Sequence, residues 1–334
     1  MFRIVSAAIV TCAALLIENP AAADIRVGWQ TGVVNTVLTY AVEAGKFSEQ
    51  GLKVEMKPFA AGPAMLPALA AGEIDLGWMG EFPATTGFAN DLPIQIVLVQ
   101  SMLPTDVRLV ATPQSKISDL KDLKGKKIGV TLGSTSHNHV LLALTAAGLT
   151  EKDVTLVNLA PAAMVPAYTA GQIDAAFTWE PGSGEMEKLG GVRLATTRSL
   201  GSMTGLFGVA NKSYLSTHSE DFQKFLRGWS SALSDYAKNP DAVLAFEAKR
   251  LNQPVNDLSK LIERQGASFP PVEKQLTPDY LGSAGNPTDS KVLAHVEGIG
   301  RFLHGIQRIN SLPPSFSPLI NPEPVQMFIK SQAK

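Results

Sequence analysis

Three consecutive hydroxyl side chains, Ser134, Thr135 and Ser136, follow a glycine turn after a short apolar segment. A helical pattern of apolar residues comes next, so the hydroxyls stand where a helix would begin. The first backbone N–H groups of a helix have no partner within it and lie at the positive end of its dipole. Together with three rotatable hydroxyl donors, these amides predict a receptor for the acidic group of a small solute. The same residues would also serve as an ordinary helix N-cap, a common use of serine and threonine.

Composition argues against several other classes of function. The 334 residues allow two domains, and contents of 45% hydrophobic and 18% charged residues are typical of a globular protein. A formal net charge of −1 gives no electrostatic reason to expect a nucleic acid or an anionic membrane as partner. His137 and His139 lie two apart without a third ligand nearby, and no dinucleotide fingerprint is present. We therefore expect no metal, no cofactor and no enzymatic activity.

Residues 1–23 have the features of an export signal. Arg3 supplies a positive start, an apolar run extends from residue 4 to residue 17, and Ala21 and Ala23 fit a cleavage site before Asp24. The apolar run is shorter than the roughly 20 residues that a membrane-spanning helix needs. Cys12, the only cysteine, lies inside this segment. We expect an exported mature protein without disulfides.

The remaining chain alternates short apolar strands with helices, which predicts an α/β fold on mainly parallel sheets. We expect strands over residues 24–29, 51–56, 74–79, 93–100, 107–111, 128–132, 154–159, 173–179 and 206–210. We expect helices over residues 33–45, 64–71, from 84 onward, 118–123, from the hydroxyl turn to Gly148, 162–170, 220–238, 241–250, 255–264 and 290–304.

A five-residue pattern occurs twice, as AGEID at 71–75 and AGQID at 170–174. Each copy is followed by a strand and then by a turn that carries a glutamate. This repetition predicts two halves of similar construction that face each other, with the ends of their strands at a shared cleft where ligands bind.

The helices after residue 216 cannot bury their apolar faces alone. We expect the chain to return and cover the first half with them. The expected domains are a first lobe of residues 24–108 and 204–334, and an inserted second lobe of residues 109–203.

Several longer motifs stand in a fixed order along the chain. They are GWQT at 28–31, ALAAGEIDLG at 68–77, DLKDLKGKKIGV at 119–130, GSTSH at 133–137, AGQIDAAFTWEP at 170–181 and SFPPVEKQLTPDYLG at 268–282. With them the chain resembles the periplasmic substrate-binding proteins of ABC importers, of the sulfonate- and taurine-binding type within the nitrate, sulfonate and thiamine-precursor group. The resemblance implies the type II periplasmic-binding-protein architecture, with two α/β lobes joined by two crossover strands. It also implies a monomer in the periplasm that closes over a small anionic or zwitterionic solute and delivers it to an ABC permease in the inner membrane.

Carried over by position, the resemblance implies ten ligand-binding residues. They are Gln30, Thr31, Gly80, Glu81, Ser134, Thr135, Ser136, His137, Trp179 and Glu180. Two positions depart from the family pattern. Relatives commonly have a small polar residue where Glu81 stands, and Leu206 replaces an acidic residue that taurine binders carry in the returning strand.

Glu81 and Glu180 favour a zwitterion over a simple anion. Each is expected at a strand end, where its charge would repel a sulfonate. An ammonium group on the solute resolves this conflict, so we expect taurine or a close aminosulfonate, with its acid at 134–136 and its amine near Glu81, Glu180 or both. A solvated loop carboxylate at Glu81 and a turn residue at Glu180 are the structural alternatives. An alkanesulfonate, a sulfate ester, nitrate or a thiamine precursor remain alternative solutes, and a biosynthetic enzyme on the same fold remains an alternative function.

Overall fold

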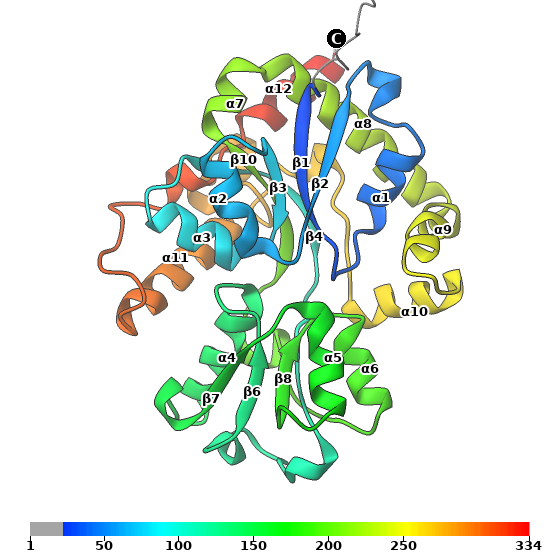
Figure 1. Ribbon diagram of the computed structural model, residues 1–334. Helices are drawn as coiled ribbons and strands as arrows, with labels where there is room; N and C mark the ends of the chain where they lie inside the picture. The colour runs from blue at the N-terminus through cyan, green and yellow to red at the C-terminus, as the bar shows by residue number, and fades with distance from the viewer. Residues whose placement is uncertain (1–22, 334) are drawn as a thin grey trace, which may run out of the picture.

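The computed structural model describes residues 23–333 and, within them, two five-stranded sheets. The sheets occupy the upper and lower halves of Figure 1, each with helices packed around it. The expected export signal, residues 1–23, lies outside the described residues except for its last position. None of the helices in the described part of the chain combines the length and the apolar character that crossing a bilayer requires.

The first sheet joins the N-terminal strands to one strand from later in the chain. Its strands are β1 (Ile25–Gln30), β2 (Val54–Phe59), β3 (Leu76–Met79), β4 (Ile94–Met102) and β10 (Gly205–Asn211). They pair in the order β2-β1-β3-β10-β4. β1 is parallel to β2 and β3, whereas β10 is antiparallel to β3 and β4. Four strands thus run one way and β10 runs against them.

The second sheet has the same plan. Its strands are β5 (Arg108–Ala111), β6 (Lys127–Val130), β7 (Thr155–Asn158), β8 (Ala175–Thr178) and β9 (Val192–Thr196). They pair in the order β7-β6-β8-β5-β9. β6 is parallel to β7 and β8, and β5 is antiparallel to β8 and β9. The expected α/β fold with mainly parallel sheets is confirmed.

Two segments carry the chain between the sheets. Residues 103–107 lead from β4 to β5, and residues 197–204 lead back from β9 to β10. All strands of the second sheet lie between these two crossings. The division into lobes of residues 24–108 with 204–334 and residues 109–203 stays a prediction, because strand pairing does not test where a folding unit ends.

The two copies of the repeated pattern occupy equivalent places in the two sheets. Asp75 Oδ2 accepts a hydrogen bond from Arg26 N (2.7 Å), and Asp174 Oδ2 accepts one from Lys127 N (2.8 Å). The backbone N–H of each aspartate donates in return to the carbonyl of the same partner. Each aspartate therefore ties the start of one strand to the start of its neighbour. The prediction of two similarly built halves is confirmed at the level of single hydrogen bonds.

Helices connect and cover the strands. Those of the described residues are α1 (Thr36–Glu43), α2 (Met65–Ala70), α3 (Glu81–Ala89), α4 (Thr135–Ala146), α5 (Pro161–Thr169), α6 (Gly182–Lys188), α7 (Lys212–Thr217), α8 (Ser219–Lys238), α9 (Pro240–Arg250), α10 (Val255–Gln265), α11 (Lys291–Gly305) and α12 (Glu323–Gln332).

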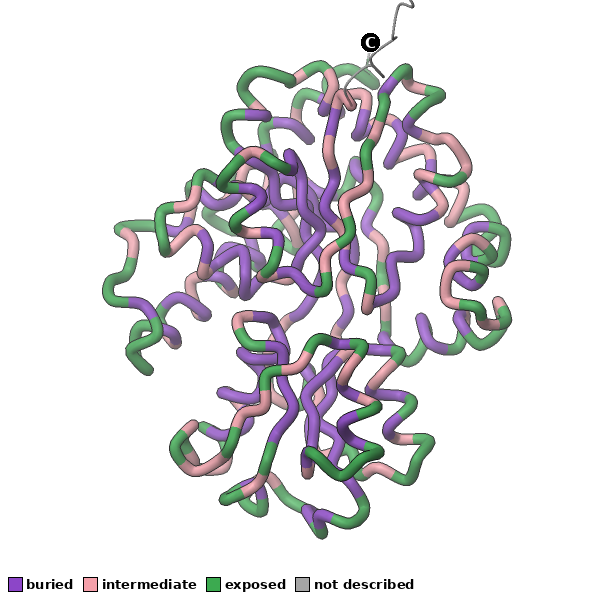
Figure 2. Tube along the Cα trace, in the orientation of Figure 1, coloured by how far each residue is buried: buried purple, intermediate pink, exposed green. Residues whose placement is uncertain are grey.

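The long helix α8 covers the first sheet with its apolar face, as expected for helices that cannot bury that face alone. Its Phe225 and Trp229 pack against Trp78 of β3, with ring centroids 6.1 and 5.3 Å away. All three side chains belong to one hydrophobic core shared with the strands of the first sheet. Figure 2 shows buried residues gathered along the strands of both halves and exposed residues on the outer turns.

Some element predictions are wrong or incomplete. α3 begins at Glu81 and not at residue 84, because Gly80 is its extended N-cap and a proline is tolerated in a first helical turn. Only residues Leu120–Leu123 of the helix expected at 118–123 are helical, as a 3₁₀ turn. The elements that the sequence did not predict are α6, α7, α12 and β9. In α6, two glycines within seven residues hide the helix, because glycine is a poor helix former.

Candidate functional site

A cleft between the two sheets is lined by residues that end or follow parallel strands. From the first sheet, Gln30 ends β1 and Gly80 follows β3. From the second sheet, Trp179 follows β8, and Ser134 lies in the turn after β6. Equivalent strand ends from both halves thus meet at the position where open α/β sheets bind ligands. The ≈ 460 Å³ within the outline of the cleft includes open solvent, and the cavity itself is only ≈ 20 Å³ in this structure, room for about one water molecule.

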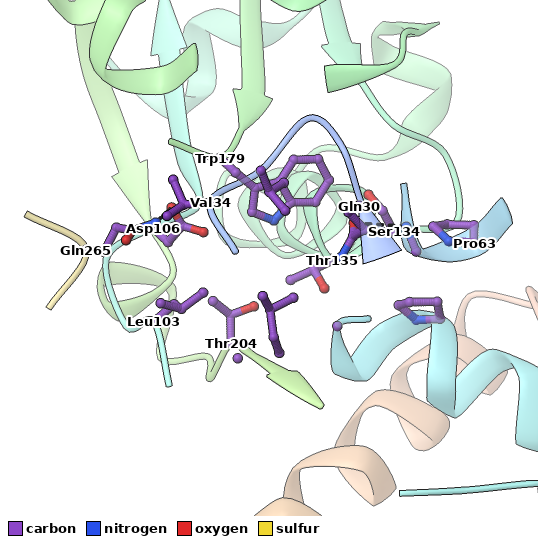
Figure 3. Close-up of a pocket in the computed structure, with 16 residues that line it drawn as sticks. Gln30, Val34, Pro63, Leu103, Asp106, Ser134, Thr135, Trp179, Thr204 and Gln265 are labelled. Carbon is purple, nitrogen blue, oxygen red and sulfur yellow. Dashed lines mark hydrogen bonds between the residues drawn. The ribbon is translucent and has the colours of Figure 1, made fainter. Parts of the chain in front are cut away.

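Both crossings between the sheets also contribute to the cleft. Asp106 comes from the first crossing, Thr204 from the second, and Gln265 from the end of α10. Figure 3 shows two separate groups of polar side chains around the cleft. Asp106 and Gln265 lie on one side, and Gln30, Ser134 and Thr135 lie toward the other.

The predicted hydroxyl turn forms the N-terminus of α4. Ser134 is the N-cap of α4. Its Oγ accepts a hydrogen bond from Ser136 N (3.2 Å) and donates one to Thr131 O (2.6 Å). Ser136 is fully buried, and its Oγ accepts from Thr131 N (3.3 Å). The ordinary capping role is therefore present. Of the three hydroxyl residues, Ser134 and Thr135 line the cleft and Ser136 does not.

The first turn of α4 also offers unpaired backbone donors. Among the residues that the structure describes, neither Thr135 N nor His137 N forms a hydrogen bond. These amides lie at the positive end of a 12-residue helix, where a negative group is favoured. Two unpaired amides thus lie at the start of α4 beside the capping role, and their binding of an anion stays a prediction.

Of the two neighbouring residues Gln30 and Thr31, both predicted to bind the ligand, only Gln30 lines the cleft. Gln30 is 5% exposed; its Oε1 accepts from Gly62 N (3.0 Å) and its Nε2 donates to Trp78 O (3.1 Å). These bonds fix its amide against the wall of the cleft. Thr31 is exposed and does not line the cleft.

Glu81 lies behind the cleft lining. It is fully buried in the first turn of α3, and Thr204 Oγ1 donates to its carboxylate (3.2 Å to Oε2). The Thr135 hydroxyl and the Gly205 backbone also bond to it. Burial raises the pKa of Glu81 to about 7, because desolvation outweighs these hydrogen bonds. Glu81 therefore holds cleft residues in place, while its neighbour Gly80 lines the cleft.

Glu180 occupies the equivalent place in the second half but has a different environment. Its Oε1 forms ion pairs with Arg108 Nη1 (2.8 Å) and Arg264 Nε (3.2 Å), and its side chain is 1% exposed. It does not line the cleft, whereas Trp179 does. The idea of Glu180 as an unpaired charge at the ligand needs correction, because two arginines from distant elements neutralise it.

His137 does not line the cleft. Its ring lies edge-on to Phe82, with centroids 6.0 Å apart, and its Nε2 lies 3.5 Å from Glu151 Oε1. Burial lowers its pKa, which favours a neutral ring. Its role in the structure is a contact between α3 and α4.

Sequence reasoning missed Asp106, Thr204 and Gln265. None of them belongs to a recognisable motif. Asp106 and Gln265 are 159 positions apart in the chain, yet Gln265 Nε2 donates to Asp106 Oδ1 at 2.8 Å. Within residues 23–333, no group of three or more His, Cys, Asp or Glu side chains is arranged to hold a metal ion.

Comparison with protein families identifies the family to which the chain belongs. The family model described as NMT1/THI5 like matches residues 34–243. The chain belongs to the NMT1/THI5-like family. This NMT1/THI5-like chain is 31% identical, over 252 residues, to the taurine-binding periplasmic protein of Escherichia coli strain K12. That match covers 72% of this chain and 76% of the relative.

Solved structures extend the comparison to the fold of NMT1/THI5-like proteins. The alkanesulfonate-binding protein SsuA from Xanthomonas axonopodis pv. citri, bound to MOPS, superposes with a TM-score of 0.73 at 25% identity. The superposition covers 90% of this chain and 96% of that protein. The expected periplasmic-binding-protein architecture is confirmed. An enzyme also has this fold, since the desulfurization enzyme DSZB matches with a TM-score of 0.62 at 15% identity over 92% of this chain and 99% of its own.

Proposed function

We propose that this protein is the solute-binding component of an ABC import system and captures a small sulfonate, taurine or a related aminosulfonate, in the cleft. The first turn of α4 carries the proposal, because Ser134 and Thr135 line the cleft and the unpaired amides of Thr135 and His137 lie in that turn. A sulfonate stays ionised at physiological pH, and each hydrogen bond to a charged group contributes roughly 1.5–3 kcal/mol. In this proposal the two unpaired amides of the turn, Thr135 N and His137 N, each supply one such bond.

The remaining roles follow from relatives and from the leader-like sequence of residues 1–23. The relatives named above bind taurine or alkanesulfonate, and the first of them is periplasmic. In this proposal the mature chain works as a monomer in the periplasm and hands its solute to an inner-membrane permease. Closure around the solute requires that the solute contact both halves, because only differential contacts shift a conformational equilibrium. The lining of the cleft by both sheets supports this requirement.

An alkanesulfonate without an amine is the second candidate, supported by the likeness to the alkanesulfonate-binding protein. To bind a sulfate ester or nitrate the same cleft would have to hold an anion, and to bind a thiamine precursor it would have to hold a ring. The proposal assigns no catalytic residue: Glu81 and Glu180 are both engaged by other side chains and do not line the cleft.

A titration panel on the purified mature chain tests the proposal. Isothermal calorimetry with taurine, ethanesulfonate, a longer alkanesulfonate, nitrate and a thiamine precursor should give saturable binding for at least one sulfonate. A bound solute also raises the apparent stability by mass action, so thermal unfolding should show the same ranking. Absence of binding by every sulfonate, with nitrate or the thiamine precursor bound instead, contradicts the proposal.

A further inference from the structure

Two side chains with hydrogen-bond acceptors lie on the side of the cleft away from the start of α4. Asp106, in the first crossing, and Gln265, at the end of α10, both line the cleft. They are 2% and 3% exposed. Figure 3 shows them together on the side away from Ser134 and Thr135.

One oxygen of Asp106 is saturated and the other is not. Oδ1 accepts from Gln265 Nε2 (2.8 Å) and from Glu180 N (3.0 Å). Among the described residues, no donor reaches Oδ2, and no basic side chain forms an ion pair with Asp106. A buried carboxylate without a cationic partner is costly, so this group is poised to receive one.

Gln265 presents a second acceptor at the same place. Its Nε2 is used by Asp106, which leaves its Oε1 buried and without a donor among the described residues. Such an orphaned acceptor normally has a partner in a native structure. Two neighbouring acceptors that lack donors therefore lie at one side of the cleft, facing a side that offers donors.

The nearby arginines do not satisfy these acceptors. Arg108 pairs with Glu180 and lies 3.5 Å from Glu187, and Arg264 pairs with Glu180. Arg108 Nε donates to Thr105 O at 3.0 Å. Neither arginine hydrogen-bonds to Asp106. Burial raises the pKa of Asp106, and the charge of Arg108 lies near enough to oppose that rise.

We propose that Asp106 and Gln265 form an ammonium subsite that holds the amine of a zwitterionic sulfonate, while the first turn of α4 holds its acid. This assignment rests on the proposed function and replaces Glu81 and Glu180 as the groups that select the amine. An ammonium has three donors and no acceptor, which matches the two acceptors without donors, Asp106 Oδ2 and Gln265 Oε1. A sulfonate without an amine leaves the buried charge of Asp106 unpaired and loses affinity for that reason.

Calorimetry with matched solutes tests the subsite. Taurine, ethanesulfonate and 2-hydroxyethanesulfonate share the acid and differ only at the other end. The wild-type chain should bind taurine about 10- to 100-fold more tightly than ethanesulfonate, the range expected for a hydrogen bond to a charged group. The hydroxy analogue should fall between them, because one hydroxyl donor satisfies one acceptor without neutralising the charge.

Asp106→Asn should remove this preference. The substitution keeps the shape and the acceptor for Gln265 and Glu180 but removes the charge, so taurine binding should weaken to that of ethanesulfonate. Ethanesulfonate binding should stay within a few-fold of wild type. Gln265→Met provides a second variant, in which the orphaned acceptor is lost and the ratio between taurine and ethanesulfonate shrinks. Asp235→Asn, a partly exposed aspartate bonded to Tyr40, is the matched control and should leave the ratio unchanged.

Equal binding of taurine and ethanesulfonate by the wild-type chain overturns the subsite and leaves the proposed sulfonate function standing. An unchanged ratio in both Asp106→Asn and Gln265→Met also overturns it. If no sulfonate binds the wild-type chain, the proposed function itself fails. If Asp106→Asn does not fold, as judged by its thermal unfolding, the ratio in Gln265→Met decides.

Discussion

Gly80 lies so close to Thr135 that a β-carbon on Gly80 would stand 2.2 Å from Thr135 Oγ1. Gly80 follows β3 of the first sheet and Thr135 begins α4 beside the second, so this contact sets how closely the two halves approach. The backbone of Gly80 is extended, with φ −72° and ψ 169°. Glycine is therefore needed at this position for space and not for its conformational freedom.

Gly80→Ala should weaken solute binding because the added methyl group forces the two sides of the cleft apart. An overpacking cost of about 1–3 kcal/mol corresponds to a loss of roughly 5- to 150-fold in affinity. Calorimetry with the best-bound sulfonate measures the loss. Gly298→Ala in α11 is the control, since a β-carbon there meets no heavy atom within 4 Å. Wild-type affinity in Gly80→Ala would show that the halves do not close at this contact.

Ser134→Ala should lower both stability and solute affinity. Loss of an N-cap hydroxyl costs about 1 kcal/mol, and fraying of α4 displaces the amides that we assign to the acid. Urea unfolding and calorimetry give the two readouts. Ser290→Ala is matched to it, because Ser290 Oγ caps α11 by accepting from Leu293 N (3.1 Å). It should lose similar stability and keep the affinity; a parallel loss of affinity would mean that stability alone explains Ser134.

Glu81 should make the protein less stable as the pH rises. Its pKa is about 7 in the folded chain, raised from 4.5 by burial, so between these values the folded chain retains a proton that the unfolded chain releases. The free energy of unfolding from this group therefore falls as pH rises from 4.5 to about 7, by at most about 3 kcal/mol. In Glu81→Gln this component is absent. Urea unfolding at pH 5 and pH 8 measures the free energy of unfolding of both proteins. The difference between the variant and the wild type should favour the variant more at pH 8 than at pH 5. An equal change with pH in both proteins would refute the assignment.

Arg108→Met should be strongly destabilising. Arg108 and Glu180 are 2% and 1% exposed, and removing one member of a buried pair costs about 3–5 kcal/mol. Adding Glu180→Gln to the variant should recover part of the loss. Arg193→Met removes a pair with Glu187 whose arginine is 49% exposed, and should cost no more than about 1 kcal/mol. Equal losses in the two single variants would contradict the buried pairing.

The sequence alone predicted those features of the fold and of the site whose pattern is local in the chain. Ser134 and Thr135 are recognisable because hydroxyls before a helical apolar pattern mark a helix start, and the repeated AG-x-ID pattern marks two equivalent strand starts. The sequence alone did not predict the environment of a side chain whose contact partner lies far away in the chain. From the sequence, Glu180 has no evident charged partner, whereas in the structure it pairs with Arg108 and Arg264 from other elements. Asp106 and Gln265 carry no motif, and only the tertiary fold brings them together across 159 positions.

The two crossings between the sheets supply Asp106 and Thr204 to the cleft, besides joining its walls. Any rotation of one half against the other must change the backbone torsions of these short segments. The same torsions aim the side chains of Asp106 and Thr204. A solute that contacts both residues would restrict these torsions directly. Binding of the solute and the angle between the two halves would then change together, without any further residues to couple them.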